Sequence, residues 1–376
     1  MNDRLKPLTL TRDLLLYDTI NPPGQERKCA EYLGKLLEDG GFQTAYYEYE
    51  ESRTSLVARI EGKSDKAPIC FTGHIDTVPL GAAHWSKDPF SGELDGDKIF
   101  GRGSTDMKGG VAAMVLAAIE ISKYSRGEAG IEVVLTAGEE YGCVGAHHLA
   151  QTDGALGKAG AVVVGEPTSN YPLIGHKGLV WLEVRTSGVT AHGSMPEEGV
   201  NAIFKAGKVI NKLEQFRFHE SPHEFLGKPT LNVGTISGGL NINSVPDQTS
   251  ICLDIRTIPG QENDEIKKRL QNYLGNEVEI LTIVESRNVA SDSSNEWIQE
   301  VFSIMTPYLH ESPQPRGATY STDACALTPA YNNPPTVILG PGEPDIAHKT
   351  DEFCYTSKLE ESKEVYLEIA KRWCHL

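Results

Sequence analysis

Short apolar runs alternate with helical patterns along the first part of the chain. Residues 25–39 have helical apolar spacing and end at Gly40 and Gly41, whereas residues 54–60 and 68–75 have the composition of strands. The alternation continues with a hairpin expected at 92–101, a helix at 108–124 and strands at 131–137 and 161–164. Strands that alternate with helices predict an α/β fold with helices on both faces of a sheet.

The pattern changes near residue 176. An alternating, half-buried strand is expected at 179–186 and an amphipathic helix at 200–215, followed by strands at 230–236 and 249–257, a helix at 261–274 and a strand at 277–284. This βαββαβ order is a self-contained unit of the size of a small inserted domain. The α/β pattern then resumes with a helix at 294–309, a strand at 335–339 and a helix from about 356. We therefore expect one domain made of 1–176 and 288–376, and an inserted domain at 177–287.

Composition excludes some classes of function. The net charge of −17 over 376 residues argues against a nucleic-acid partner, because phosphate binding needs clustered Lys and Arg. The first twenty residues lack a signal-peptide core and no apolar run is long enough to span a membrane, so a cytoplasmic protein with no membrane partner is expected. The seven Cys are odd in number and form no CxxC pair, which predicts neither a disulfide framework nor a thiolate zinc site.

Four motifs place metal-binding side chains where buried strands are expected to end. They are FTGHIDTVP with His74 and Asp76, GRGSTDMKGG with Asp106, LTAGEE with Glu139 and Glu140, and VVVGEPT with Glu166. In an open α/β sheet the ligand site lies beyond the carboxyl ends of the strands. Acidic and imidazole groups gathered there would repel one another without a cation, and both are good zinc ligands.

Each motif taken alone has an ordinary explanation. GHID can be a loop in which the His is hydrogen-bonded and binds no metal. Adjacent Glu residues usually begin a solvent-exposed helix, and GEP is usually a turn. GRGSTDMKGG lacks the Gly-Lys-Ser/Thr ending of a phosphate loop, and its Asp replaces the glycine fingerprint of a nucleotide-binding α/β protein. The four motifs in this order are much harder to explain separately.

Together the motifs resemble the zinc-dependent M20-type exopeptidase and deacylase family. That family contains acetylornithine deacetylase, succinyl-diaminopimelate desuccinylase, aminoacylase and the glutamate carboxypeptidases. The resemblance covers nearly the whole chain, because GHIDTVP, GRGSTDMKGG, AGEE and GEPT recur in this order and at similar spacings. It implies a mixed-sheet catalytic domain with an inserted, ferredoxin-like lid and dimerisation domain.

The resemblance also implies two zinc ions per subunit, with Co2+ or Mn2+ able to substitute. His74 and Glu166 would hold one ion and Glu140 and His348 the other, with Asp106 bridging the two. Asp76 resembles the residue that orients His74, and Glu139 resembles the general base that takes a proton from the attacking water. The peptide bond after Asp106 is cis in this family, and we expect the same here.

The inserted domain supplies the remaining implied residues. His192 matches a histidine that contacts the substrate carbonyl, commonly from the neighbouring subunit of a dimer, so a homodimer through this domain is expected. Asn243 and Arg256 match positions that bind the substrate carboxylate, which suits the planar guanidinium of Arg. Lys177 in GHKG, and Gly317 and Thr322 in the segment GATYSTD, are further candidates for the substrate cleft.

The substrate is expected to be a small N-acyl amino acid. GHKG, STDA and the LGPG…AH…DE ending resemble acetylornithine deacetylase more than a desuccinylase, which usually has two basic residues where this chain has His176 and Lys177. The predicted order is therefore acetylornithine deacetylase first, succinyl-diaminopimelate desuccinylase second, and a dipeptidase or carboxypeptidase third. A relative that binds a ligand without catalysis is the alternative outside the enzymes, although Glu139 and the five ligands are all present.

Overall fold

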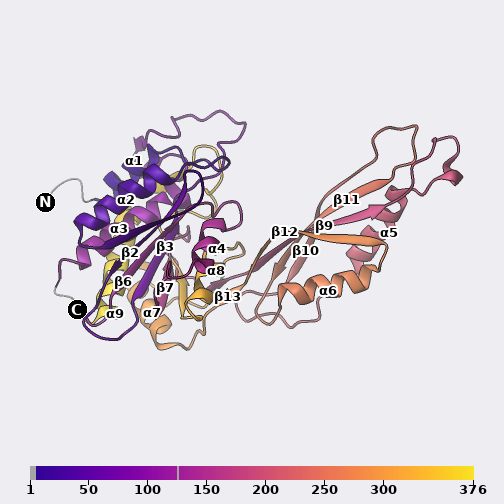
Figure 1. The fold of residues 1–376 in the computed structure, drawn as a ribbon. Coiled ribbons are helices and arrows are strands. Elements are labelled where there is room, and N and C mark those ends of the chain that lie inside the picture. Colours follow the sequence, from indigo (N-terminus) through magenta and orange to yellow (C-terminus); the bar gives the residue numbers. More distant parts are fainter. Residues whose placement is uncertain (1–5, 125–126) are drawn as a thin grey trace. The chain divides into compact units, whose positions relative to one another are not determined.

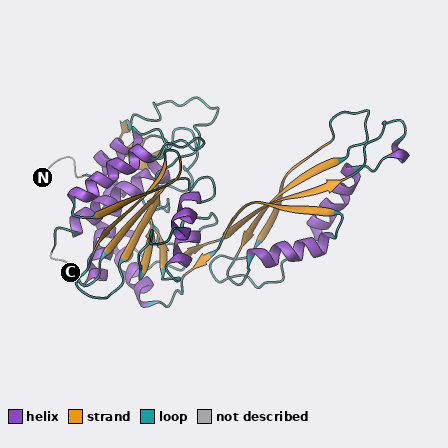
Figure 2. Cartoon of the chain, viewed as in Figure 1, coloured by secondary structure: helices purple, strands orange, loops and turns teal. Residues whose placement is uncertain are grey.

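The chain divides into two units, each with a sheet of its own (Figures 1 and 2). The structure is a computed structural model that describes residues 6–124 and 127–376. Unit 1 contains the chain up to 175 together with 290–317 and 322–376, and unit 2 contains 176–289 and 318–321. The second unit is thus inserted into the sequence of the first.

A six-stranded mixed sheet forms the centre of unit 1, as the family resemblance implied. In spatial order its strands are β1 (Gln43–Glu50), β2 (Arg53–Ile60), β6 (Ile131–Thr136), β3 (Ile69–His74), β7 (Ala161–Val164) and β14 (Thr336–Ile338). β6, β3, β7 and β14 are parallel, and β1 and β2 are antiparallel to their neighbours. Every residue of β3, β6, β7 and β14 is buried, which explains why these strands are continuous apolar runs rather than alternating ones.

Helices cover both faces of this sheet. They are α1 (Pro7–Leu15), α2 (Arg27–Asp39), α3 (Gly109–Ile121), α4 (Val144–Gln151), α7 (Glu296–Leu309), α8 (Ala324–Ala330) and α9 (Thr356–Cys374). α3 contacts β3 and β6 and packs against α1 and α9, whereas α4 contacts β1 and β2 and packs against α8. Figure 1 shows α1, α2 and α3 on one side of the sheet and α4 and α8 on the other. α3 is buried almost entirely, which agrees with its apolar side chains on every face.

Two smaller groups of strands lie outside the main sheets. β4 (Leu94–Asp95) and β5 (Lys98–Phe100) form the predicted hairpin, and β15 (Phe353–Tyr355) pairs antiparallel with β5. The two-residue strands β8 (Gly175–His176) and β13 (Val289–Ala290) pair with each other. The pairing of β15 with β5 brings the segment after His348 back beside the loop that carries Asp106.

Unit 2 has the element order strand, helix, strand, strand, helix, strand. The elements are β9 (Gly178–Ser187), α5 (Ala202–Gln215), β10 (Thr230–Gly238), β11 (Gln248–Thr257), α6 (Asn263–Leu274) and β12 (Val278–Ser286). The sheet order is β10-β11-β9-β12 and all neighbours are antiparallel. Alternate residues of β9 and β11, such as Val180, Leu182 and Leu253, form a core with the inner faces of both helices.

Some elements have no counterpart among those expected from the sequence. β1 is partly exposed and mixes aromatic with acidic residues, so its apolar signal is weak. α1, α4 and α8 have only seven to nine residues, too few for a helical repeat to stand out. Within the part of the chain that the structure describes, no helix has both the length and the apolar character needed to cross a membrane.

Candidate metal centre

Three neighbouring parallel strands deliver the acidic motifs to one edge of the sheet. His74 is the last residue of β3, Glu139 and Glu140 follow the end of β6, and Glu166 follows the end of β7. β3 pairs in parallel with both β6 and β7, so the carboxyl ends of all three strands lie together. The location agrees with the rule that ligand sites of open α/β sheets lie beyond these ends.

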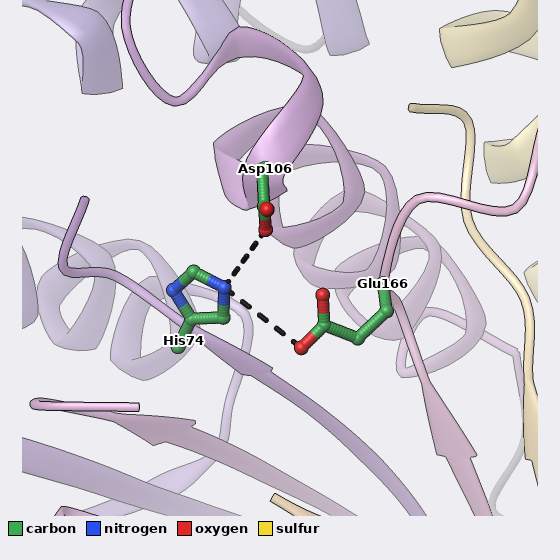
Figure 3. A group of neighbouring side chains, drawn as sticks. All are labelled: His74, Asp106 and Glu166. Carbon is green, nitrogen blue, oxygen red and sulfur yellow. Dashed lines mark hydrogen bonds and ion pairs between the residues drawn. The ribbon is translucent and has the colours of Figure 1, made fainter. Parts of the chain in front are cut away.

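The first group of candidate ligands is His74, Asp106 and Glu166. His74 Nε2 lies 3.0 Å from Asp106 Oδ1 and 3.8 Å from Glu166 Oε1, and Figure 3 shows the three side chains converging. All three are buried. One donor atom from each lies within 4.8 Å of the other two, a separation that suits ligands of a single ion.

The second group is Asp106, Glu140 and His348. His348 Nε2 lies 3.2 Å from Asp106 Oδ2 and 3.1 Å from Glu140 Oε2. Asp106 therefore uses one carboxylate oxygen toward each group, which is the geometry of a bridging ligand. The His348 side chain is 53% exposed whereas that of Glu140 is 7% exposed, so the second group is reached from solvent through His348.

Asp76 ties the two motifs after β3 and β6 together. The backbone oxygen of Asp76 lies 3.0 Å from His74 Nδ1 and one carboxylate oxygen lies 3.6 Å from the same nitrogen. The Asp76 carboxylate also accepts the backbone N–H of Glu139 at 3.0 Å and that of Glu140 at 3.3 Å. Asn21 donates to it as well, at 2.9 Å. Asp76 thus fixes the direction of the His74 ring and the path of the Glu139–Glu140 loop.

A buried glutamate that the sequence did not single out, Glu352, holds the loop of Asp106. One Glu352 carboxylate oxygen accepts the backbone N–H groups of Gly103, Thr105 and Asp106 at 3.1, 2.9 and 3.1 Å. The other oxygen pairs with the buried Arg102. The Asp106–Met107 peptide bond in this loop is cis, which confirms the expectation. The sequence gives little indication of this pair, because Arg102 and Glu352 are 250 positions apart along the chain.

The carboxylates of the centre are crowded in a buried place. Burial and the charge of Glu166 raise the pKa of Glu139 well above its ordinary value, and burial also raises the pKa of Glu166 and Glu140. Burial would raise the pKa of Asp106 too, but hydrogen bonds with His348 and His74 hold it well below its usual range. Glu140 Oε1 is buried and has no hydrogen-bond partner among the described residues. A divalent cation in each group would offset this repulsion and satisfy that oxygen, so the donor set fits two metal ions.

Glu139 has neighbours that the sequence did not predict. Cys143 lies in the same loop and its Sγ is 3.5 Å from Glu139 Oε1. Asp323, just before α8, is buried and accepts a hydrogen bond from Thr136 at the end of β6. Asp323 comes close to this loop because α8 packs against α4, the helix that follows the loop.

Unit 2 contains the candidate substrate residues His192, Asn243 and Arg256. His192 is exposed, its Nδ1 is 2.7 Å from Ser194 Oγ, and the next residue, Gly193, donates its N–H to the carbonyl of Asn243 at 2.7 Å. Arg256, on β11, is held by both oxygens of Asp254 at 2.8 and 3.0 Å.

The remaining candidate substrate residues are distributed over both units. Lys177 is mostly buried in unit 2 and its Nζ donates to the carbonyl of Lys228 at 2.6 Å. In unit 1, Gly317 is partly exposed, whereas Thr322 is fully buried and its hydroxyl accepts the N–H of Ala324. Whether these residues touch substrate stays a prediction.

Residues 70–372, about four fifths of the chain, match the family described as peptidase family M20/M25/M40. The chain belongs to this family. A probable succinyl-diaminopimelate desuccinylase from Staphylococcus epidermidis is 31% identical over 396 aligned positions, covering 96% of each chain. An acetylornithine deacetylase from Vibrio atlanticus is 29% identical over 361 positions, covering 92% of each chain. Membership makes this M20 protein a metallohydrolase that acts on amide bonds.

Solved structures have the same fold. An M20 family metallo-carboxypeptidase from Sulfolobus solfataricus superposes with a TM-score of 0.84 over 100% of both chains, at 18% identity. A Bacillus subtilis protein described as a dinuclear metal binding peptidase of the M20 family superposes with a TM-score of 0.73 over 98% of both chains, at 15% identity. The mixed α/β architecture predicted from the sequence is confirmed by these likenesses.

The role of Glu352 predicts a large loss of stability when its side chain is removed. Glu352→Ala leaves Arg102 as an unpaired buried charge and strips three backbone N–H groups of their acceptor, so the free energy of unfolding should fall by about 3–5 kcal/mol. Urea unfolding followed by circular dichroism measures the change. The exposed Glu311→Ala is the matched control and should change stability by less than about 0.5 kcal/mol. Equal effects of the two substitutions would contradict the bracing role of Glu352.

Proposed function

We propose that this M20 protein hydrolyses the amide bond of a small N-acyl amino acid at a centre that holds two zinc ions. The observation that carries the proposal is the position of Asp106, whose two carboxylate oxygens face two separate His-carboxylate groups. A shared carboxylate of this kind keeps two ions close enough to act on one water and one carbonyl. The location at the carboxyl ends of parallel strands supports the same function.

The donor set supports zinc. His nitrogen and carboxylate oxygen, three donors to each group with one shared, are ligands that Zn2+ binds well, and Co2+ or Mn2+ can occupy similar sites. Three protein donors leave a coordination position for water or substrate, which is typical of a catalytic zinc site. The first ion would be held by His74, Asp106 and Glu166, and the second by Asp106, Glu140 and His348.

Glu139 is the proposed proton carrier. When bound, the two ions would lower the pKa of a shared water and polarise the acyl carbonyl. Glu139 lies beside the ligands but belongs to neither of the two groups, so its carboxylate is available to take the proton of the water and return it to the departing amine. Burial and then the charge of Glu166 raise the pKa of Glu139, so its carboxylate is a stronger base than that of an ordinary glutamate.

The acyl group is proposed to be succinyl first and acetyl second. This reverses the order predicted from the sequence, because the 31% identical relative is described as a probable succinyl-diaminopimelate desuccinylase and the acetylornithine deacetylase is 29% identical. A cationic pair in unit 2 also favours a dicarboxylate substrate. Burial and then the charge of Arg256 lower the pKa of Lys177. Asp254 already pairs with Arg256, and a substrate carboxylate is proposed to pair with Lys177. Asn243, Gly317 and Thr322 are proposed as further substrate contacts.

A homodimer through unit 2 is proposed from its exposed apolar side chains. β10 is at the edge of the sheet, and Ile236 on this strand is 54% exposed. Phe204 on α5 is 74% exposed, and Leu240 and Ile242 in the loop after β10 are almost fully exposed. An unpaired edge strand beside exposed apolar residues is a typical protein interface. In the proposed dimer His192, also exposed, contacts the substrate carbonyl bound by the neighbouring subunit.

Metal content tests the two groups of ligands. Wild-type protein reconstituted with zinc should hold two ions per chain, Asp106→Ala should lose both, and His348→Ala should keep the one held by His74 and Glu166. Metal analysis after gel filtration, with activity lost in chelator and restored by zinc, is the measurement. The exposed Asp345→Ala is the matched control and should hold two ions. Asp106→Ala with undiminished zinc would refute the bridging role.

Glu139→Gln tests the proposed reaction. The substitution keeps the size of the side chain but removes its ability to accept a proton, so kcat should fall by roughly 10²–10⁴-fold or more while zinc content stays the same. The exposed Glu61→Gln should leave kcat unchanged. A parallel loss of zinc would instead make Glu139 a ligand.

A substrate panel measures the function itself. N-succinyl-diaminopimelate, N-acetylornithine, N-acetylmethionine and several dipeptides are compared with the zinc-loaded protein, and the succinyl substrate should have the highest kcat/KM. Faster hydrolysis of a dipeptide would make the protein a peptidase. Zinc-loaded protein that hydrolyses none of the panel would overturn the proposed function.

The dimer is tested by placing a charge in the exposed apolar surface. Phe204→Asp should convert a dimer into a monomer of 41.0 kDa in analytical ultracentrifugation, and activity should fall because His192 no longer reaches the neighbouring site. Leu16→Asp is the control, since Leu16 is 66% exposed but lies in unit 1. A fully active wild-type monomer would sink the proposal.

A further inference from the structure

A second cluster of donors includes Glu139, next to the metal centre, and none of the five proposed ligands. It consists of Glu139, Cys143, Asp323 and Cys325 and is called the thiol cluster below. One donor atom each from Glu139, Cys143 and Asp323 lies within 4.8 Å of the other two, as in the two groups of proposed zinc ligands. All four residues belong to unit 1.

The two thiols of the cluster are in contact with each other. Cys143 and Cys325 share a hydrogen bond, and Cys143 Sγ also lies 3.5 Å from Glu139 Oε1. On the other side, Cys325 Sγ lies 4.0 Å from His147 Nε2. Both cysteines are buried, and neither is part of a disulfide. The cluster therefore offers two sulfur donors and two carboxylates in a small volume, with an imidazole next to it.

Asp323 supplies an independent sign that the cluster is incomplete. Its side chain is 1% exposed, and one of its oxygens accepts a hydrogen bond from the Thr136 hydroxyl. The other oxygen, Oδ1, is buried and has no hydrogen-bond partner among the described residues. A buried carboxylate oxygen without a donor is costly, so buried polar atoms are usually satisfied by a donor or an ion.

We propose that the thiol cluster binds a third divalent cation, one that prefers sulfur ligands, separate from the two ions of the metal centre. Binding would replace the S–H proton of Cys143, which leaves to solvent, by a metal–sulfur bond, while Glu139 and Asp323 supply oxygen ligands. Soft thiolate donors select Zn2+, Co2+ or Cd2+ over Mg2+ and Ca2+. The sequence predicted no thiolate zinc site because Cys143 and Cys325 are far apart along the chain and form no CxxC pair.

Occupation of this site has a consequence for the proposed reaction. Glu139 cannot accept a proton from water while its carboxylate is bound to a cation, so the third ion would inhibit hydrolysis when metal exceeds the two ions of the centre. This consequence rests on the proposed function, whereas binding of the ion does not. The two parts can therefore be tested separately.

Cobalt titration tests the site without any activity measurement. A cobalt–thiolate bond gives a charge-transfer absorption band in the near ultraviolet, which the two proposed centres cannot give because their ligands are only His and carboxylate. Metal-free protein in a phosphine reductant, which keeps Cys143 and Cys325 from forming a disulfide, is titrated with Co2+. The band should grow after the second equivalent and be lost in Cys143→Ala and reduced in Cys325→Ala.

Two further variants and a folding measurement distinguish loss of the metal site from loss of the fold. Cys252→Ala, in unit 2, should keep the full band, and circular dichroism verifies that each variant is folded. Asp323→Asn leaves both thiols in place but should weaken cobalt binding at this site by at least about tenfold. A folded wild-type protein with no band at excess Co2+, or a Cys143→Ala variant with the same band, would overturn the proposal.

Inhibition provides the second readout. Excess Zn2+ should inhibit hydrolysis by the zinc-loaded wild-type protein, and the inhibitory concentration should rise by at least about tenfold in Cys143→Ala relative to that variant's own uninhibited rate. Excess Mg2+ should not inhibit. Equal zinc inhibition in both proteins would refute the inhibitory role, even if the cobalt band were present.

Discussion

Electrostatic repulsion among buried carboxylates is the constraint on which this structure depends. Asp106, Glu139, Glu140 and Glu166 lie within one buried region together with Asp323, and the pKa of each except Asp106 is raised. Such an arrangement is unfavourable by itself, because burial and like charges both disfavour the ionised form. It becomes favourable when cations are bound, so the folded chain is prepared for metal. The proposed amide hydrolysis uses the same cations to activate water.

The surrounding structure keeps these groups in place through backbone hydrogen bonds. Asp76 holds the backbone of Glu139 and Glu140, and Glu352 holds the backbone around Asp106. Both are carboxylates that are fully buried, and both accept several N–H groups. The residues proposed to act on metal and substrate are therefore oriented by a second layer of acidic residues that bind no ion in our proposal.

Much of the fold and the centre could be predicted because the signals are local. The apolar runs of β3, β6 and β7 predicted buried strands of an α/β sheet, and the acidic or imidazole residue after each run predicted a ligand site at their ends. The pattern of unit 2 predicted its βαββαβ order for the same reason. His348 is different, since its late loop has no strand signal and it was assigned only through the family resemblance.

The sequence by itself determined the α/β class, the family and the residues of the candidate metal centre, because each of these depends on short motifs and on local periodicity. Only the tertiary structure decided which residues support them. Glu352 reaches Asp106, and Cys325 reaches Cys143, across about 180 to 250 positions of chain. Such contacts depend on how β15 pairs with β5 and how α8 packs on α4, and no local pattern encodes them.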